Sequence, residues 1–119
     1  MSNAAGSKWI RPVSRLAIYL RDGMACVYCG HAVEEGERLT LDHLRPRSSG
    51  GTHAPSNLVT CCSHCNSARQ DRPVAAWARA VAEYTLESPE AILARVRRTV
   101  RRSVPRAEAR ELMARRAAG

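Results

Sequence analysis

An Asp and a His stand side by side in the stretch LTLDHLRPRSSGG, which covers residues 39–51. A carboxylate is a good ligand for a hard divalent cation. A neutral imidazole can accept a proton, because its ordinary pKa is about 6.5. Asp42 and His43 therefore have the chemistry of a metal ligand beside a general base. Such a pair taken alone is more often a turn cap beside a surface histidine, so the interpretation depends on the rest of the chain.

Four of the five cysteines form two pairs with the same spacing. Cys26 and Cys29 make one C-x2-C pair, and Cys62 and Cys65 make the second. Two such pairs in an intracellular chain predict a four-thiolate zinc site, whose role is structural because no coordination position stays open. A redox dithiol would not explain the repeated spacing. Cys61 could replace Cys62 in principle, but Cys62 repeats the first spacing, and Cys61 is expected to be a small buried residue.

Charge and composition restrict the class of protein. The chain has 119 residues, of which 45% are hydrophobic and 4% aromatic, and its formal net charge is +8. These values predict one domain with an extension, a small aliphatic core that a metal would reinforce, and nucleic acid as the partner. Residues 1–88 carry 10 Lys and Arg against 8 Asp and Glu, whereas residues 89–119 carry 9 Arg against 3 Glu. A solvated arginine-rich helix face is the alternative interpretation of that second segment.

The same composition predicts a cytoplasmic protein without membrane contact. The sequence has no run of 18 apolar residues, which a membrane-spanning helix would need. It also has no apolar leader core near its start, which an exported chain would be expected to carry. We expect a flexible N-terminus over residues 1–10, a core with flanking helices over 11–88 and an arginine-rich helical extension over 89–119.

Local patterns predict the elements that position Asp42 and His43. Leu39 and Leu41 alternate with a polar residue, which favours a short strand. Residues 57–62 are typical of a second strand, and the Pro, Ser and Gly between the two indicate a loop. The chain is therefore α+β, with a short two-stranded sheet.

Helices are predicted on both sides of this sheet. Pro12 suits the first position of a helix, which should stop at Gly23. After the second cysteine pair, one helix is expected to turn into another at Pro73. Ser88 before Pro89 is typical of an N-cap, so an arginine-rich helix should start there.

Two asparagines complete the polar constellation. Asn57 follows His43 by 14 residues, and Asn66 follows Asn57 by 9. The segment CVYCG…LTLDHLRPRSSGGTHAPSNLVTCCSHCNSAR closely resembles the HNH endonucleases, the ββα-metal or His-Me finger nucleases with a four-cysteine zinc. The resemblance covers residues 24–72 and rests on D-H-x2-P, a Gly-Gly loop, N-L-V and C-x2-C-N, in that order between the cysteine pairs. It implies a small treble-clef-like, zinc-clamped ββα-metal core with flanking helices.

The resemblance also implies an activity, namely hydrolysis of DNA phosphodiester bonds by an activated water. In this family pattern His43 is the general base, Asp42 and Asn66 hold a catalytic divalent cation, and Asn57 helps to position the base. The cation is expected to be Mg²⁺ or Mn²⁺, since both prefer oxygen ligands. Basic side chains should contact phosphates without reading sequence; they are Arg45, Arg47, Arg69, Arg97, Arg98, Arg101 and Arg102.

Two other functions fit the same residues. One is a zinc-clamped DNA-binding module without catalysis, and the other is a component of a larger phage or restriction assembly with a protein partner. The remaining histidines and aromatic residues suggest no chemistry of their own. His31 and His53 are expected to be loop residues without a role, and Trp77 and Tyr84 to belong to a helical core.

Overall fold

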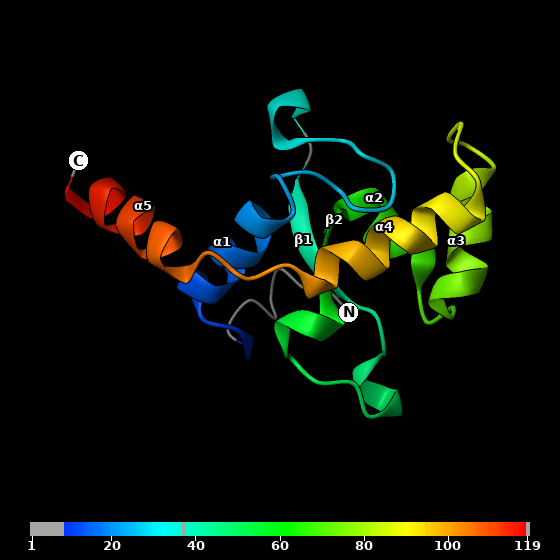
Figure 1. Ribbon diagram of the computed structural model, residues 1–119, viewed down its shortest axis with the longest axis horizontal. Helices are drawn as coiled ribbons and strands as arrows, with labels where there is room; N and C mark the ends of the chain where they lie inside the picture. Colours follow the sequence, from blue (N-terminus) through cyan, green and yellow to red (C-terminus); the bar gives the residue numbers. More distant parts are fainter. Residues whose placement is uncertain (1–8, 37, 119) are drawn as a thin grey trace.

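The computed structural model describes residues 9–36 and 38–118 (Figure 1). A small sheet lies in the middle, and helices flank it on both sides. Along the chain the elements are α1 (Pro12–Arg21), η2 (Val33–Glu35), β1 (Leu39–His43), η3 (Arg47–Ser49), η4 (Pro55–Asn57), β2 (Leu58–Cys62), α2 (Ser63–Arg69), α3 (Val74–Ala82), α4 (Pro89–Arg101) and α5 (Arg106–Ala118).

The centre of the fold is a ββα unit. Strands β1 and β2 pair antiparallel, with Asp42 opposite Val59 and His43 opposite Leu58. Helix α2 starts at the residue after β2 and packs against both strands. All of β2 is buried, whereas β1 is buried only at Leu41, so β1 presents its polar side chains at a partly open edge. The fold is α+β with a two-stranded sheet, as predicted from the sequence.

The apolar core has two parts, one on each side of the sheet. The larger part surrounds the cysteines and includes Trp77, Ile92 and Val96 from α3 and α4. The smaller part gathers Ile18, Leu41 and other aliphatic side chains between α1 and the strands. Burial of Trp77 confirms its predicted place in the core, but Tyr84 is 51% exposed, so that prediction was wrong. Tyr84 lies beyond the end of α3, where its ring has His64 of α2 as an edge-on neighbour.

A buried ion pair joins α1 to β2. Arg21 contacts Asp22 at 2.6 Å, and the side chains of both are at most 1% exposed. Arg21 also donates to the carbonyl oxygen of Leu58 at 2.6 Å, and the Asp22 carboxylate accepts the backbone N–H of Thr60 at 2.8 Å. Removal of either charge would leave the other buried and unpaired, which is strongly destabilising. This pair therefore holds β2, and the loop before it, in one position.

The helix boundaries follow local sequence signals. Helix α1 begins at Pro12, and α4 begins at Pro89 after Ser88, whose hydroxyl accepts the N–H of Ala91 at 3.1 Å. Helix α2 ends before Gln70, which has a positive φ of 54°, and α3 starts directly after Pro73. The predicted change of direction near this proline is confirmed.

The segment after residue 88 packs in two places. Helix α4 adds Ile92 and Val96 to the larger core cluster, whereas α5 lies along α1 (Figure 1). At the other end of the chain, Trp9 and Ile10 contact the smaller core cluster; the rest of the predicted flexible segment 1–10 lies outside the described residues. Across 9–36 and 38–118, no helix is long and apolar enough to span a membrane.

Candidate functional site: a cysteine cluster beside a polar strand end

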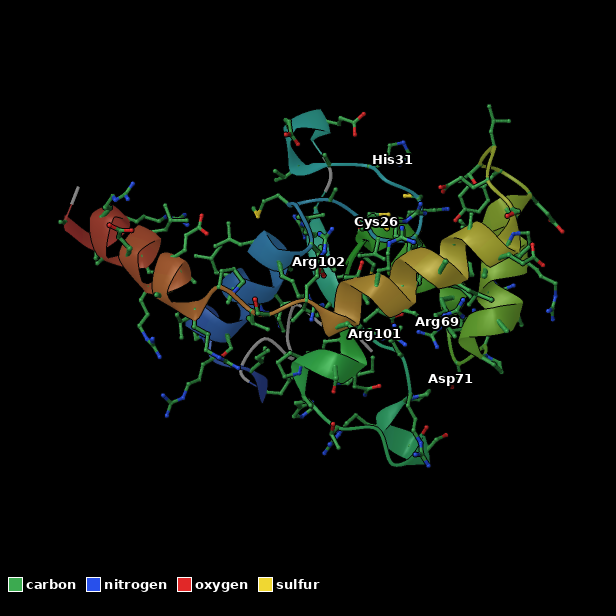
Figure 2. The ribbon with its side chains drawn as sticks, viewed as in Figure 1. Cys26, His31, Arg69, Asp71, Arg101 and Arg102 are labelled. Carbon is green, nitrogen blue, oxygen red and sulfur yellow. The ribbon has the colours of Figure 1, made fainter. Side chains whose placement is uncertain are left out.

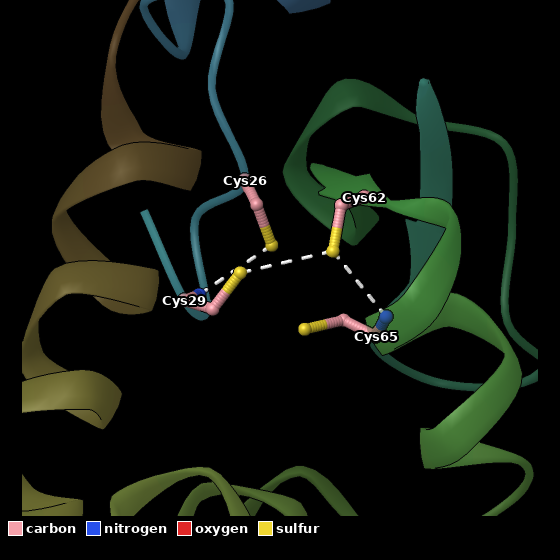
Figure 3. Close-up of side chains that lie close together, drawn as sticks. All are labelled: Cys26, Cys29, Cys62 and Cys65. Carbon is pink, nitrogen blue, oxygen red and sulfur yellow. Dashed lines mark hydrogen bonds between the residues drawn. The ribbon is translucent and has the colours of Figure 1, made fainter. Parts of the chain in front are cut away.

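The four paired cysteines meet at one point (Figure 3). Their Sγ atoms all lie within 4.8 Å of one another. Cys26 and Cys29 lie on the loop after α1, Cys62 ends β2 and Cys65 belongs to α2. In each pair the first sulfur accepts a backbone N–H from the second cysteine, at 3.4 Å in both. The four cysteines are thus positioned to bind a metal ion, and they bring the loop after α1 together with the end of β2 and the start of α2.

The charges of the cluster favour a cation. Hydrogen bonds from the Cys29 and Cys65 thiols lower the pKa of Cys26 to about 2. The same contacts, together with burial, raise the pKa of both donor thiols. Loss of protons from all of these thiols therefore needs positive charge at the centre, which a divalent cation supplies. Cys61 is fully buried and outside this set, as predicted.

Side chains from neighbouring elements support the cluster. The imidazole Nδ1 of His31 lies 3.3 Å from the Cys29 sulfur, and the Tyr84 hydroxyl lies 3.5 Å from the Cys65 sulfur. Arg95 of α4 donates to the carbonyl oxygens of Val27 and Tyr28 at 2.7 and 3.1 Å. Helix α4 is thereby tied to the backbone of the first cysteine pair.

Asp42 is held from two directions at the end of β1. The Tyr28 hydroxyl donates to its Oδ2 at 2.6 Å, and the guanidinium of Arg69 forms an ion pair with the same oxygen. Burial raises the pKa of the Asp42 carboxyl, and the positive charge of Arg69 opposes this rise. Tyr28 lies between the two cysteines of the first pair, so the hydrogen bond from its hydroxyl connects the cysteine cluster to the strand end.

Arg69 is buried, although the sequence predicted that it would contact phosphates. Its side chain is 1% exposed, and it donates to the carbonyl oxygens of His43 at 3.0 Å and Leu44 at 2.8 Å. A guanidinium that leaves water must be hydrogen-bonded and paired, and the end of β1 offers a carboxylate and two carbonyls to α2. The predicted phosphate contact would require Arg69 on the surface, and the structure places it inside.

His43 faces a second imidazole. Its Nε2 lies 3.0 Å from Nδ1 of His53, and the Trp9 ring lies 4.8 Å from the His43 ring and 4.4 Å from that of His53, measured between centroids. Burial, His53 and Arg47 lower the pKa of His43 to about 4. The imidazole is therefore neutral at neutral pH, the form in which it can take up a proton.

Sequence reasoning missed His53 and Trp9 as members of this site. His53 follows the Gly-Gly turn closely in the sequence, but ten residues separate it from His43, and only the folded loop brings the rings together. Trp9 precedes α1 and gives no local signal of this contact.

Asn57 closes the loop that carries His53. Its Oδ1 accepts the backbone N–H of Arg45 at 2.9 Å, and its Nδ2 donates to the carbonyl oxygens of Arg45 at 3.1 Å and Thr52 at 2.8 Å. The loop is tightest at Gly51, where a Cβ would lie 1.7 Å from the Arg45 carbonyl oxygen. The side chain of Asn57 thus fixes the loop, and its contacts are with backbone atoms.

Asn66 lies on α2, three residues before Arg69. Residues at this spacing share a helix face, and Arg69 reaches Asp42 from that face. Asn66 is half-buried, and its spacing from Arg69 predicts that it lies toward the side of α2 from which Arg69 reaches Asp42.

The other predicted phosphate-binding arginines are exposed. Arg45 and Arg47 lie on the loop, where each donates to a backbone carbonyl oxygen, at 2.7 and 3.1 Å. Arg101 and Arg102 lie at the C-terminal end of α4, where this helix meets η4 (Figures 1 and 2). The exposed Arg97 and Arg98 precede them on the same helix. The arginine-rich end of α4 thus borders the segment that ends at Asn57.

Known proteins match this part of the chain. Residues 26–72 match the family described as HNH endonuclease. A curated relative, the CRISPR-associated endonuclease Cas9 of Actinomyces naeslundii, is 34% identical over 68 residues, which are 56% of this chain and 6% of the relative. The crystal structure of the Type II-C Cas9 enzyme from Actinomyces naeslundii is similar with a TM-score of 0.56 and 30% sequence identity, and the match covers 71% of this chain and 9% of that one.

These matches agree with the geometry. The chain spans less than a tenth of the length of either relative, so they bear on the ββα unit and its cysteines. The matched residues include both cysteine pairs, the Asp-His pair and both asparagines. Residues 26–72 of this chain thus match the HNH endonuclease family in sequence, and the fold that contains them is similar to part of the Cas9 structure.

Proposed function

We propose that this protein is a metal-dependent endonuclease that hydrolyses DNA phosphodiester bonds, with His43 as the general base. The observation that carries the proposal is the partly buried imidazole of His43 directly after Asp42 in the sequence, at the end of a strand packed against α2. The match of residues 26–72 to the HNH endonuclease family supports nuclease activity in general.

The cysteine cluster would hold zinc. Four thiolates at this separation suit a tetrahedral Zn²⁺ ion and leave no position for a substrate. Such an ion is structural, and it would join the loop after α1 to the start of α2.

A second cation would be held by Asp42 and Asn66. Both hydrogen bonds that the described residues donate to Asp42 end on Oδ2, so Oδ1 is the oxygen offered to a cation. With the amide oxygen of Asn66, this set suits Mg²⁺ or Mn²⁺. When bound, the cation supplies charge neutralisation at the phosphate and at the leaving oxygen.

The reaction then needs one proton transfer at His43. The imidazole takes a proton from water, the water oxygen forms a bond to phosphorus, and the bond from phosphorus to the leaving sugar oxygen breaks. Partial burial keeps the ring neutral before this step. Positioned general bases contribute about 10²–10⁴-fold to such rates.

DNA would lie across the loop and the end of α4. The exposed arginines at this end border η4 and thus the loop near His43. Contacts of this kind follow the phosphate backbone and give affinity without sequence preference.

One observation favours a second candidate, the non-catalytic DNA-binding module. The guanidinium of Arg69 already balances the charge of Asp42, which would weaken the attraction of that carboxylate for a cation. A role within a larger assembly is a further candidate, since the chain spans only a small part of its relatives.

Cleavage of supercoiled plasmid tests the proposal. The purified protein is incubated with and without Mg²⁺ or Mn²⁺, beside His43→Ala, and the binding of a labelled duplex is measured for both proteins. Nicking or linearisation that needs both the cation and His43, with binding retained in the variant, supports the nuclease. Binding without cleavage by folded, zinc-loaded protein in either cation supports the binding module.

A further inference from the structure

Tyr28 is a fully buried residue whose hydroxyl has no role in the function described above. It lies between Cys26 and Cys29 of the cysteine cluster, yet its hydroxyl reaches β1 and donates to Oδ2 of Asp42 at 2.6 Å. A phenylalanine would fill almost the same volume without a buried polar group that needs a partner. The contribution of this hydroxyl is therefore to be sought at Asp42.

The direction of the hydrogen bond follows from the neighbouring groups. The guanidinium of Arg69, which can only donate, lies 3.3 Å from the Tyr28 oxygen. The phenol oxygen thus accepts from Arg69, and its own proton goes to the carboxylate, which only accepts when it is ionised. Both donors that the described residues direct at Asp42 end on Oδ2. The carboxylate is therefore held by one oxygen.

The ring and the backbone of Tyr28 are both fixed. The ring meets the indole of Trp77 edge to face, with 5.9 Å between centroids and an interplanar angle of 89°. Arg95 donates to the carbonyl oxygen of Tyr28 at 3.1 Å. The backbone N–H of the preceding Val27 donates to the carbonyl oxygen of Thr60 in β2 at 2.9 Å. A side chain held in this way can orient another side chain.

We propose that Tyr28 is a positioning residue, whose hydroxyl holds Oδ2 of Asp42 and so keeps Oδ1 available to the divalent cation. The inference rests on the proposed function. Arg69 alone would not select one oxygen, because a guanidinium can bind both oxygens of a carboxylate with two of its N–H groups. A phenol has one proton and binds one oxygen. With both donors on Oδ2, the other oxygen stays open to a cation that Asp42 and Asn66 would share.

Tyr28→Phe tests the inference by removing the hydroxyl and keeping the ring against Trp77. Isothermal titration calorimetry of Mn²⁺ into the zinc-loaded protein reads the cation site without activity. We expect the Kd for Mn²⁺ to rise about 10- to 100-fold, the usual effect of losing a group that orients a metal ligand. Tyr19→Phe is the matched control, because the Tyr19 hydroxyl donates to the carbonyl oxygen of Leu39 at the other end of β1, at 3.2 Å. Its loss should leave this Kd unchanged.

The cation dependence of cleavage separates positioning from a general loss of structure. Tyr28→Phe should need about 10- to 100-fold more Mn²⁺ for half-maximal plasmid cleavage. At saturating Mn²⁺ its rate should approach that of the unsubstituted protein, and its zinc content should be the same. A rate that stays low at every Mn²⁺ concentration, with an unchanged Kd, would mean that the hydroxyl only supports the fold, and it would overturn the inference.

Asn66→Ala distinguishes failure of the inference from failure of the proposed function. This variant removes the other proposed ligand and leaves the ion pair between Asp42 and Arg69 in place. Weaker Mn²⁺ binding in both Asn66→Ala and Tyr28→Phe supports the inference. Weaker binding in Asn66→Ala, with unchanged or tighter binding in Tyr28→Phe, would overturn the inference alone. Unchanged binding in Asn66→Ala would overturn the cation site of the proposed function, and the inference with it.

Discussion

The cysteine cluster and the polar end of β1 are neighbouring sites that are built in opposite ways. In the cluster, four like side chains face one another, and an added cation would balance their charge once the thiols lose their protons. At the strand end, the chain supplies its own partners: Asp42 has Arg69 and Tyr28, and His43 has His53. The first site is therefore expected to depend on its metal for folding, and the second to keep its shape without one.

Tyr28 connects the two regions. It lies between the cysteines of the first pair, is fully buried, and donates a hydrogen bond from its hydroxyl to Asp42. Arg95 binds the carbonyl oxygen of the same residue. A substitution in the first cysteine pair should thus also perturb Asp42 at the strand end. Removal of a polar side chain at the strand end need not disturb the cysteines.

The largest expected effect is on the cysteine cluster. Cys62→Ala, or removal of the metal with a strong chelator, should unfold the domain, because binding of structural zinc contributes ~10–16 kcal/mol, as much as the ~5–15 kcal/mol total stability of a domain. The adjacent Cys61→Ala, outside the cluster, should cost only about 1–2 kcal/mol. Circular dichroism measures the unfolding, and a zinc assay verifies that the metal has been removed. An unchanged melting temperature after removal would show that folding does not depend on a metal at the cysteine cluster.

His43→Ala should abolish most cleavage and leave the fold intact. The rate of plasmid nicking should fall about 10²–10⁴-fold, while the melting temperature and duplex affinity stay close to those of the unsubstituted protein. Full cleavage by this variant would remove His43 from the reaction.

Arg69→Met should destabilise the protein by about 3–5 kcal/mol, because Asp42 would stay buried without its positive partner. Urea denaturation at neutral pH measures the loss. Arg79→Met, at an exposed position on α3, is the matched control and should change stability by less than about 0.5 kcal/mol. Equal stability of the two variants would mean that the Asp42 carboxylate is not charged or not buried in solution.

The smallest effect is expected at the end of α4. Replacing Arg101 and Arg102 with Gln should weaken duplex binding and lower the slope of log K against log salt by about 0.9 for each phosphate that the protein no longer neutralises. Fluorescence anisotropy across a salt series reads the slope, and Arg79→Gln serves as a single-charge control at a site away from the proposed interface. An unchanged slope would restrict the DNA interface to the loop.

Local chemistry determined much of this protein from its sequence. The spacing of the cysteine pairs predicted the cluster because two ligands three residues apart can bind one ion only from a tight turn. Pro12, Ser88 with Pro89, and Pro73 predicted helix starts because each acts on the backbone beside it. The order of Asp-His, Asn57 and Asn66 relative to the two cysteine pairs was sufficient to indicate the family that residues 26–72 match.

Only the tertiary structure decided what each polar side chain contacts. Arg69 was expected on the surface, yet burial and an adjacent carboxylate hold it inside, 27 residues from Asp42 in the sequence. Trp9 and His53 meet His43 through packing of the N-terminal segment and closure of a loop. Such contacts depend on long-range packing and on the cost of leaving a charge unpaired, and neither quantity is encoded in the spacing of residues along the chain.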